Sequence, residues 1–213
     1  MASAEHSKKL RLLLIPFFAT SHIGPFTDLA VRLATARPAD VGVGAPVAVT
    51  PANVAVVRSA LQRHGSVASG MVSVTTYPFP AVDGVPPGVE NLSAGGGEGW
   101  RISAAAFDEA LTRPAQEALI RDRSPDALIT DAHFWNVAVA DELGVPCVSF
   151  SVISLFSGLD MHLLAAAAIT DDSDSEEATV AGFPVPEVRI PRSEVPDFLT
   201  SRRNLDGIDL HNR

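Results

Sequence analysis

Two residues, His22 and Asp131, have the side-chain types and the chain positions that general base catalysis needs. His22 follows an apolar run at 10–16, and Asp131 directly follows another at 127–130. A carboxylate that accepts a hydrogen bond from one imidazole nitrogen fixes the tautomer and leaves the other nitrogen as a base. The pair would meet if both runs are neighbouring parallel strands, because ligands of such sheets bind beyond the carboxyl ends of the strands. The alternative is a histidine in a surface loop and an aspartate that caps a helix.

Short apolar runs alternate along the chain with longer amphipathic stretches, which is typical of successive βα units. The expected strands are residues 10–16, 47–50, 71–77, 127–130 and 145–150. The expected helices are one that begins at Pro25, with Asp28 in its first turn, and four at 53–64, 100–123, 136–143 and 153–169. Within 100–123, Pro114 is expected either to kink the helix or to start a second segment. Residues 78–99 are dense in proline and glycine and are expected to form a flexible loop. The repeats predict an α/β fold: an open, parallel, Rossmann-like sheet with helices on both faces. The usual order of such sheets makes the first and fourth strands neighbours.

The expected domain is residues 1–170, because periodicity fades after that point. Residues 171–213 are expected to be an irregular, acidic and proline-containing connection. Its stretch from Asp171 to Glu177 carries five acidic residues, which repel one another, so it is expected to be mobile and free of metal.

Composition and motifs exclude several classes of protein. The formal net charge of −9 argues against sequence-independent binding to the phosphates of nucleic acid. The single cysteine, Cys147, excludes an intramolecular disulfide and a zinc site built on several thiolates. The first βα segment has no G-x-G-x-x-G motif, which argues against a nucleotide-dependent oxidoreductase. The sequence also has no G-x-S-x-G motif, which argues against an α/β-hydrolase.

The basic and apolar start of the chain imitates a signal peptide. Arg11 interrupts its apolar stretch and Pro16 breaks it, and no stretch approaches the roughly 20 apolar residues of a membrane span. The expected location is therefore the cytoplasm.

Four motifs, in order and at suitable spacing, make the chain resemble the plant UDP-glycosyltransferases of glycosyltransferase family 1. They are SHIGP at 21–25, PDALITDAHFW at 125–135, VADELGVP at 139–146, and GFP at 182–184 followed by VPDFL at 195–199. The resemblance implies a GT-B fold, in which an N-terminal domain takes the acceptor and a C-terminal domain binds the UDP-sugar. The family's donor signature has no counterpart here, so the chain is similar to the acceptor-binding half.

The resemblance also implies a mechanism and a set of site residues. His22 would remove a proton from the acceptor hydroxyl, Asp131 would hold His22, and Ser21 would reach the donor. The sugar, expected to be glucose, would be transferred with inversion from a UDP-sugar co-substrate, with no metal and no other cofactor. The acceptor, a phenolic, flavonoid or hormone-like aglycone, would contact Phe18, His133, Phe134, Phe156 and His162. By itself the chain is expected to be inactive, and the alternative is a small-molecule binding module that has lost catalysis.

Overall fold

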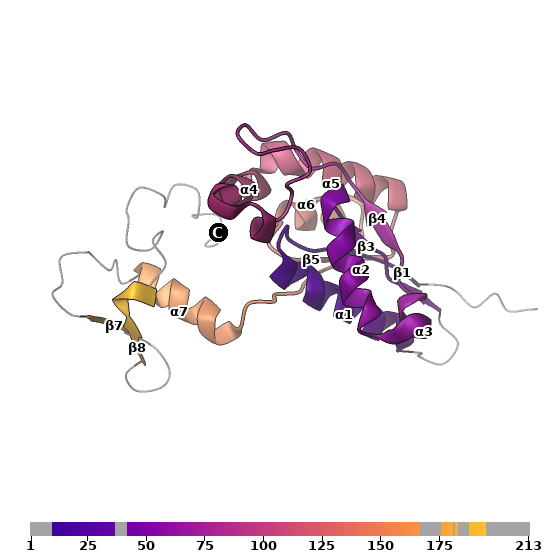
Figure 1. The fold of residues 1–213 in the computed structure, drawn as a ribbon. Helices are drawn as coiled ribbons and strands as arrows, with labels where there is room; N and C mark the ends of the chain where they lie inside the picture. The colour runs from indigo at the N-terminus through magenta and orange to yellow at the C-terminus, as the bar shows by residue number, and fades with distance from the viewer. Residues whose placement is uncertain (1–9, 37–41, 167–175, 181, 183–187, 195–213) are drawn as a thin grey trace, which may run out of the picture. The chain divides into compact units, whose positions relative to one another are not determined.

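One parallel sheet organises the first part of the chain (Figure 1). A computed structural model describes residues 10–36, 42–166, 176–180, 182 and 188–194. The strands of the sheet are β1 (Leu10–Ile15), β2 (Val43–Gly44), β3 (Val47–Val49), β4 (Val74–Thr76), β5 (Ala127–Thr130) and β6 (Cys147–Ser149). Their order is β4-β3-β1-β5-β6, with β2 beside the start of β1, and every pair is parallel. The expected fold class is therefore confirmed. The strands expected at 10–16 and 127–130, which are β1 and β5, are neighbours as predicted.

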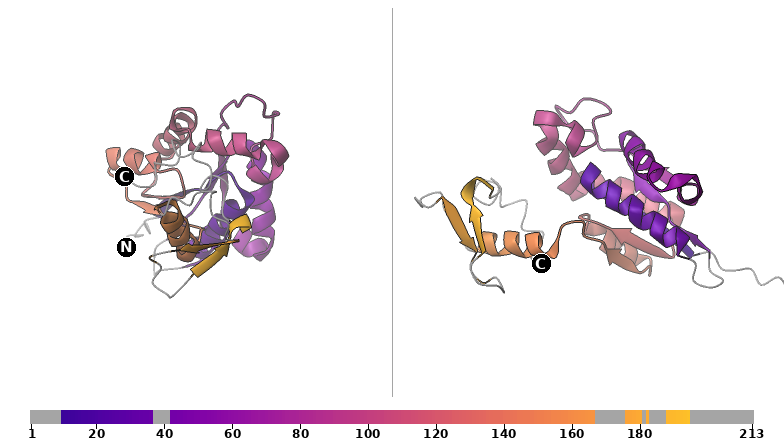
Figure 2. Two further views of the ribbon diagram at one scale, coloured as in Figure 1. Left: turned by 90° about the vertical axis from the view of Figure 1, so that its left-hand side faces the viewer. Right: turned by 60° about the horizontal axis from the view of Figure 1, so that its bottom comes forward.

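Alternating side chains of β1 separate two hydrophobic clusters, one on each face of the sheet. Leu12 and Leu14 belong to the cluster beneath α1 (Thr20–Thr35) and α2 (Val54–Gln62). Leu13 and Ile15 belong to the cluster beneath α4 (Gly99–Phe107), α5 (Glu109–Arg123) and α6 (Trp135–Glu142). This alternation is what a strand covered on both faces requires, since successive side chains point to opposite sides. Figure 2 shows the same strands between the helices from two further directions.

Helix α1 begins five residues earlier than the sequence pattern predicts. The carbonyl of Ala19, in extended conformation, accepts hydrogen bonds from the backbone N–H groups of His22 (3.0 Å) and Ile23 (2.9 Å), which starts the helix before Pro25. Pro25 therefore lies inside the helix, where its missing N–H removes one internal bond. The expectation of a loop up to residue 24 was wrong, and His22 lies in the first helical turn. Asp28 lies in mid-helix and pairs with Arg63 and His64.

The segment from 78 to 98 is held in place by buried polar contacts, contrary to the expectation of a flexible loop. Asn91 is buried and its amide nitrogen donates to the side-chain oxygen of Asn53, 2.6 Å away. The backbone N–H of Leu92 donates to the carbonyl of Phe18 at 3.0 Å. The short 3-10 turns η2 (Leu92–Ala94) and η3 (Gly96–Glu98) follow. The segment is thus tied to the residues that precede α1.

The long helix expected at 100–123 is two helices, divided at Asp108. The carboxylate of Asp108 accepts from the N–H of Leu111 at 3.2 Å and so caps α5, while Pro114 lies inside α5. Two further turns flank α2: η1 (Pro51–Asn53) and the short helix α3 (Gly65–Ser69).

The chain separates into two compact units, one up to Val152 and one from Ile153. In its described part, the second unit contains α7 (Leu155–Ala166), the antiparallel pair β7 (Glu177–Val180) and β8 (Val188–Pro191), and the turn η4 (Arg192–Glu194). The expected boundary at residue 170, most of the acidic stretch, and the GFP and VPDFL motifs lie largely outside the described residues.

Candidate active site

The side chains of His22 and Asp131 are in direct contact. Asp131 immediately follows β5 and His22 lies just after β1, and these strands are adjacent with Ile15 opposite Thr130. The Nδ1 atom of His22 lies 2.5 Å from Oδ2 of Asp131. The side chain of Asp131 is 7% exposed and that of His22 is 16% exposed. The pair is therefore mostly shielded from water, but the imidazole keeps a solvent-accessible part.

The chemistry of this contact fixes the state of both groups. A carboxylate can only accept, so Nδ1 of His22 carries the proton and, in the neutral ring, Nε2 has a free lone pair. When Nε2 takes up a proton, the adjacent carboxylate stabilises the resulting imidazolium. The arrangement can therefore remove a proton from a hydroxyl group placed at Nε2.

Phe17 contributes both backbone and ring to the site, a role that the sequence patterns did not indicate. Its backbone N–H donates to Oδ2 of Asp131 at 3.3 Å, which helps to hold the carboxylate. Its ring centroid lies 5.2 Å from that of His22 and 5.7 Å from that of His133. The phenyl ring thus touches both imidazoles of the region. An aromatic residue just after an apolar strand was the available sequence signal.

His133 is wholly buried, and its surroundings are polar as well as aromatic. Its Nδ1 lies 3.0 Å from the amide nitrogen of Gln116, and its ring stacks on Trp135 with centroids 5.0 Å apart. Burial, only partly opposed by the charge of Asp131, lowers the pKa of His133 to about 4, so the ring is neutral at physiological pH. Because no part of the ring is exposed, its assignment to the acceptor pocket stays a prediction that this burial does not favour.

The remaining expected site residues fall into two groups. In the first unit, Ser21 is exposed beside His22, and Phe134 is 46% exposed at the start of α6. Phe18 is 1% exposed and packs against Tyr77 and Phe79, so it belongs to the core. Phe134 is thus better placed than Phe18 to meet a ligand.

Phe156 and His162 lie on α7 in the second unit, and both are exposed. Their assignment to the acceptor pocket stays a prediction. No group of three or more metal-ligating side chains occurs among the residues that the structure describes. Within the same residues, no helix is long and apolar enough to cross a membrane.

Comparison with curated proteins finds plant UDP-glycosyltransferases. UDP-glycosyltransferase 79A2 of Stevia rebaudiana is 31% identical over 153 residues, 71% of this chain. Solanidine UDP-glucose glucosyltransferase 1 of Solanum tuberosum is 26% identical over 204 residues, 93% of this chain. The chain spans 32% and 40% of the length of these two relatives, respectively. No family model matches the chain.

Comparison with solved structures gives the same result. The crystal structure of UGT73P12 of Glycyrrhiza uralensis, complexed with glycyrrhetinic acid 3-O-monoglucuronide, superimposes with a TM-score of 0.68 at 26% identity. It aligns with 95% of this chain, which corresponds to 40% of that protein. The structural neighbours have the GT-B fold, and the sheet described above is one Rossmann-like domain of it. The chain therefore belongs to the plant UDP-glycosyltransferase family.

Proposed function

We propose that the chain is the N-terminal, acceptor-binding part of a UDP-sugar-dependent glycosyltransferase, in which His22 is the general base. The observation that carries this proposal is the 2.5 Å contact between His22 and Asp131 at the carboxyl ends of adjacent strands. A small-molecule binding module has no need of a buried carboxylate that orients an imidazole. The family membership supplies the reaction class in which such a base is needed.

The reaction that this geometry supports begins at Nε2 of His22. This atom takes the proton of an acceptor hydroxyl while the hydroxyl oxygen attacks the anomeric carbon of the UDP-sugar. The bond between the anomeric carbon and the phosphate oxygen breaks, UDP leaves with the bonding electrons, and the configuration at the anomeric carbon inverts. Asp131 holds the imidazole and stabilises its positive charge during the transfer. As the resemblance to the family implies, we expect these steps to need no metal.

The acceptor that we propose is a hydroxylated small metabolite. Relatives are named for solanidine and for nuatigenin, and a structural neighbour holds glycyrrhetinic acid 3-O-monoglucuronide. The acceptor panel to be tested therefore contains these compounds together with phenolic, flavonoid and hormone-like aglycones. UDP-glucose is the first donor to be tested. Phe134 and Ser21, which are exposed and lie close to Asp131 and His22 in the sequence, are the residues that we expect to meet acceptor and donor. The lone Cys147 fits a reducing compartment such as the cytoplasm.

The experiment that tests the proposal joins this chain to a donor-binding half. The residues that match solanidine UDP-glucose glucosyltransferase 1 replace the corresponding segment of that protein, and the purified hybrid is incubated with UDP-glucose and the acceptor panel. Mass spectrometry then detects glucosides. We expect at least one glucoside, formed 10² to 10⁴ times more slowly, to order of magnitude, after Asp131→Asn, because the tautomer of His22 is then no longer held.

The matched control uses the other His–Asp pair of the same unit. His64 Nε2 lies 2.7 Å from Oδ1 of Asp28, and this partly buried pair links the turn between α2 and α3 to α1. Asp28→Asn removes the same charge as Asp131→Asn but leaves the dyad intact. Equal rates for the two variants would contradict the proposed role of the dyad, and a hybrid that binds acceptors but forms no glucoside would favour the binding module.

A further inference from the structure

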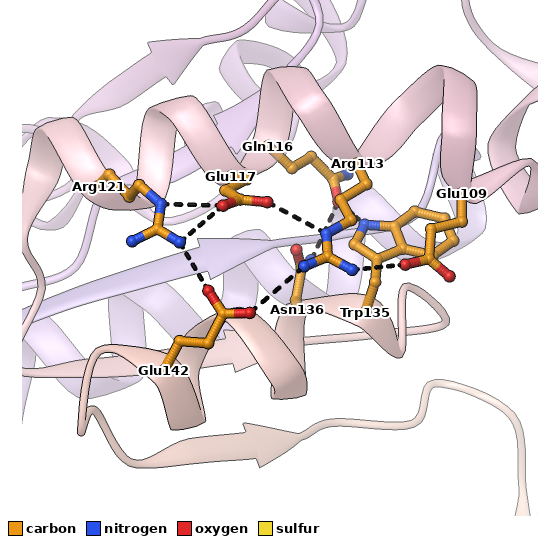
Figure 3. A network of polar contacts seen from close by, with 8 residues as sticks. All are labelled: Glu109, Arg113, Gln116, Glu117, Arg121, Trp135, Asn136 and Glu142. Carbon is orange, nitrogen blue, oxygen red and sulfur yellow. Dashed lines mark hydrogen bonds and ion pairs between the residues drawn. The ribbon is translucent and has the colours of Figure 1, made fainter.

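In the first unit, the amide of Gln116 joins four buried side chains, and all four of its hydrogen-bonding positions are used. The oxygen of Gln116 accepts from Nε1 of Trp135 at 2.9 Å and from the amide nitrogen of Asn136 at 3.0 Å. Its nitrogen donates to the hydroxyl of Tyr77 at 3.1 Å and to Nδ1 of His133 at 3.0 Å. Gln116, His133 and Asn136 are fully buried. Figure 3 shows the side chain of Gln116 between Trp135 and Asn136.

One of these partners fixes the direction of the whole group. The indole N–H of Trp135 can only donate, so the atom that faces it must be the oxygen of Gln116. The nitrogen of Gln116 is then directed at His133 and donates to Nδ1, which must carry a lone pair. His133 is therefore neutral and its proton is on Nε2. A proton on Nδ1 would face the N–H of Gln116, and Gln116 cannot reverse without opposing the N–H of Trp135.

The tautomer matters because two imidazoles compete for one carboxylate. His133 lies two residues after Asp131, and its ring and that of His22 both contact the ring of Phe17. The charge of Asp131 favours protonation of His133, and the charge of His22 opposes it. A second imidazolium at this place would draw on the negative charge that stabilises His22.

We propose that Gln116 is a positioning residue: its amide holds His133 as the neutral Nε2–H tautomer, so that Asp131 serves His22 alone. The inference rests on the proposed function for the importance of His22, but the tautomer follows from the contacts themselves. The polar and charged groups that act on His133 are the amide of Gln116, the carboxylate of Asp131, the imidazole of His22 and the carbonyl of Ala106. The hydroxyl of Tyr77 accepts from the same amide nitrogen of Gln116.

The test reads the tautomers directly, by two-bond ¹H–¹⁵N correlation spectra of the histidine side chains in the ¹⁵N-labelled chain. Single His variants assign the signals. In the wild-type chain we expect His133 as the Nε2–H tautomer with no titration between pH 8 and pH 6, and His22 as the Nδ1–H tautomer. An Nδ1–H tautomer of His133, or a titration midpoint above pH 6, would overturn the proposal without any variant having to fold.

Gln116→Glu tests the cause of this state. A carboxylate still accepts from Trp135 but can also accept from Nδ1 of His133, so we expect the Nδ1–H signal of His133 to appear and its titration midpoint to rise by about 1 to 3 pH units. Gln62→Glu, the same change at an exposed position near the end of α2, should leave His133 as it is. A wild-type-like His133 in Gln116→Glu would overturn the proposal.

The consequence for the dyad is read from the Nδ1–H proton of His22. His133→Phe should leave this signal in place between pH 6 and pH 8, because the ring it replaces is uncharged, whereas Gln116→Glu should move it upfield. Equal shifts in both variants, or none in Gln116→Glu, would show that Gln116 does not protect the dyad. The absence of glycosyl transfer in the hybrid enzyme would bear on the proposed function and would leave these spectra unchanged.

Discussion

The burial of His133 should make the stability of the first unit depend on pH. The imidazole is wholly buried, and burial lowers its pKa from 6.5 to about 4 in the folded chain. The unfolded chain exposes the ring and binds a proton as the pH falls below about 6.5. Because the folded chain binds this proton only near pH 4, acidification favours the unfolded state. The contribution of His133 is therefore complete above about pH 6.5 and is lost as the pH falls from there to 4.

The magnitude follows from the difference between the two pKa values. One pKa unit corresponds to about 1.4 kcal/mol, so 2.5 units amount to about 3 kcal/mol at pH 4 and below. Between pH 7 and pH 5 the expected loss is about 2 kcal/mol. With a typical dependence of unfolding free energy on urea, this loss lowers the urea midpoint by about 1 M.

Urea unfolding followed by tryptophan fluorescence measures this loss, since Trp135 stacks on His133. Carboxylates elsewhere also respond to acid, so the quantity of interest is the difference between the wild type and His133→Phe. His133→Phe lowers the free energy of unfolding by the same amount at every pH, because the amide nitrogen of Gln116 loses a partner. The variant has no imidazole at this position, so its stability lacks the contribution that depends on pH. A difference that stays the same at pH 7 and pH 5 would refute the reasoning.

Three further predictions concern packing, the 78–98 segment and activity. Phe26→Ala should lower the free energy of unfolding, measured by urea titration, by about 3–5 kcal/mol. The ring of Phe26 has no exposed surface and packs edge-on against Phe150. The control Phe134→Ala removes a half-exposed ring and should lower the free energy of unfolding far less. Asn91→Ala should speed hydrogen exchange of residues 78–98, because it strands a buried oxygen of Asn53 at a cost of about 1–3 kcal/mol; unchanged exchange would mean that other contacts hold the segment. The isolated 213-residue chain should form no glucoside from UDP-glucose that mass spectrometry detects. Positioning of the two reactants is worth about 7–11 kcal/mol, and the family's donor signature has no counterpart in this sequence. Glucoside formation by this chain that disappears in the His22→Ala variant would contradict the prediction.

The sheet could be predicted from the sequence because its signals are local. The run ALIT forms β5 at 127–130 as expected, and parallel βα repeats allow few strand orders. The expected adjacency of the strands at 10–16 and 127–130 predicted that His22 and Asp131 lie at the carboxyl ends of neighbouring strands. The structure places the two side chains in contact there. The dyad was therefore within reach of sequence reasoning.

The parts that could not be predicted depend on contacts between distant residues. The start of α1 was misplaced because proline is most frequent at the first helical position, whereas the helix begins at Thr20, after Ala19, five residues before Pro25. The 78–98 segment looked flexible because its composition is that of a loop, and its anchor, Asn53, is 38 residues away from Asn91.

The role of Gln116 was also missed, since its partners come from two other segments of the chain, Tyr77 and residues 133–136. One signal was present: Gln116 shares the helical face of Thr112, Leu119 and Ile120, where an apolar residue is usual. A polar side chain at such a position must be satisfied by buried partners, which for Gln116 are Tyr77, His133, Trp135 and Asn136.

One comparison of rates decides whether His22 is the base of a glycosyl transfer. Glucoside formation from UDP-glucose is measured for the hybrid enzyme with His22→Ala and with His64→Ala, two variants that each remove an imidazole paired with an aspartate. We expect His22→Ala to lower the rate by 10² to 10⁴, to order of magnitude, and His64→Ala to leave it within about twofold of the unmodified hybrid. Equal rates for the two variants would show that His22 is not the base.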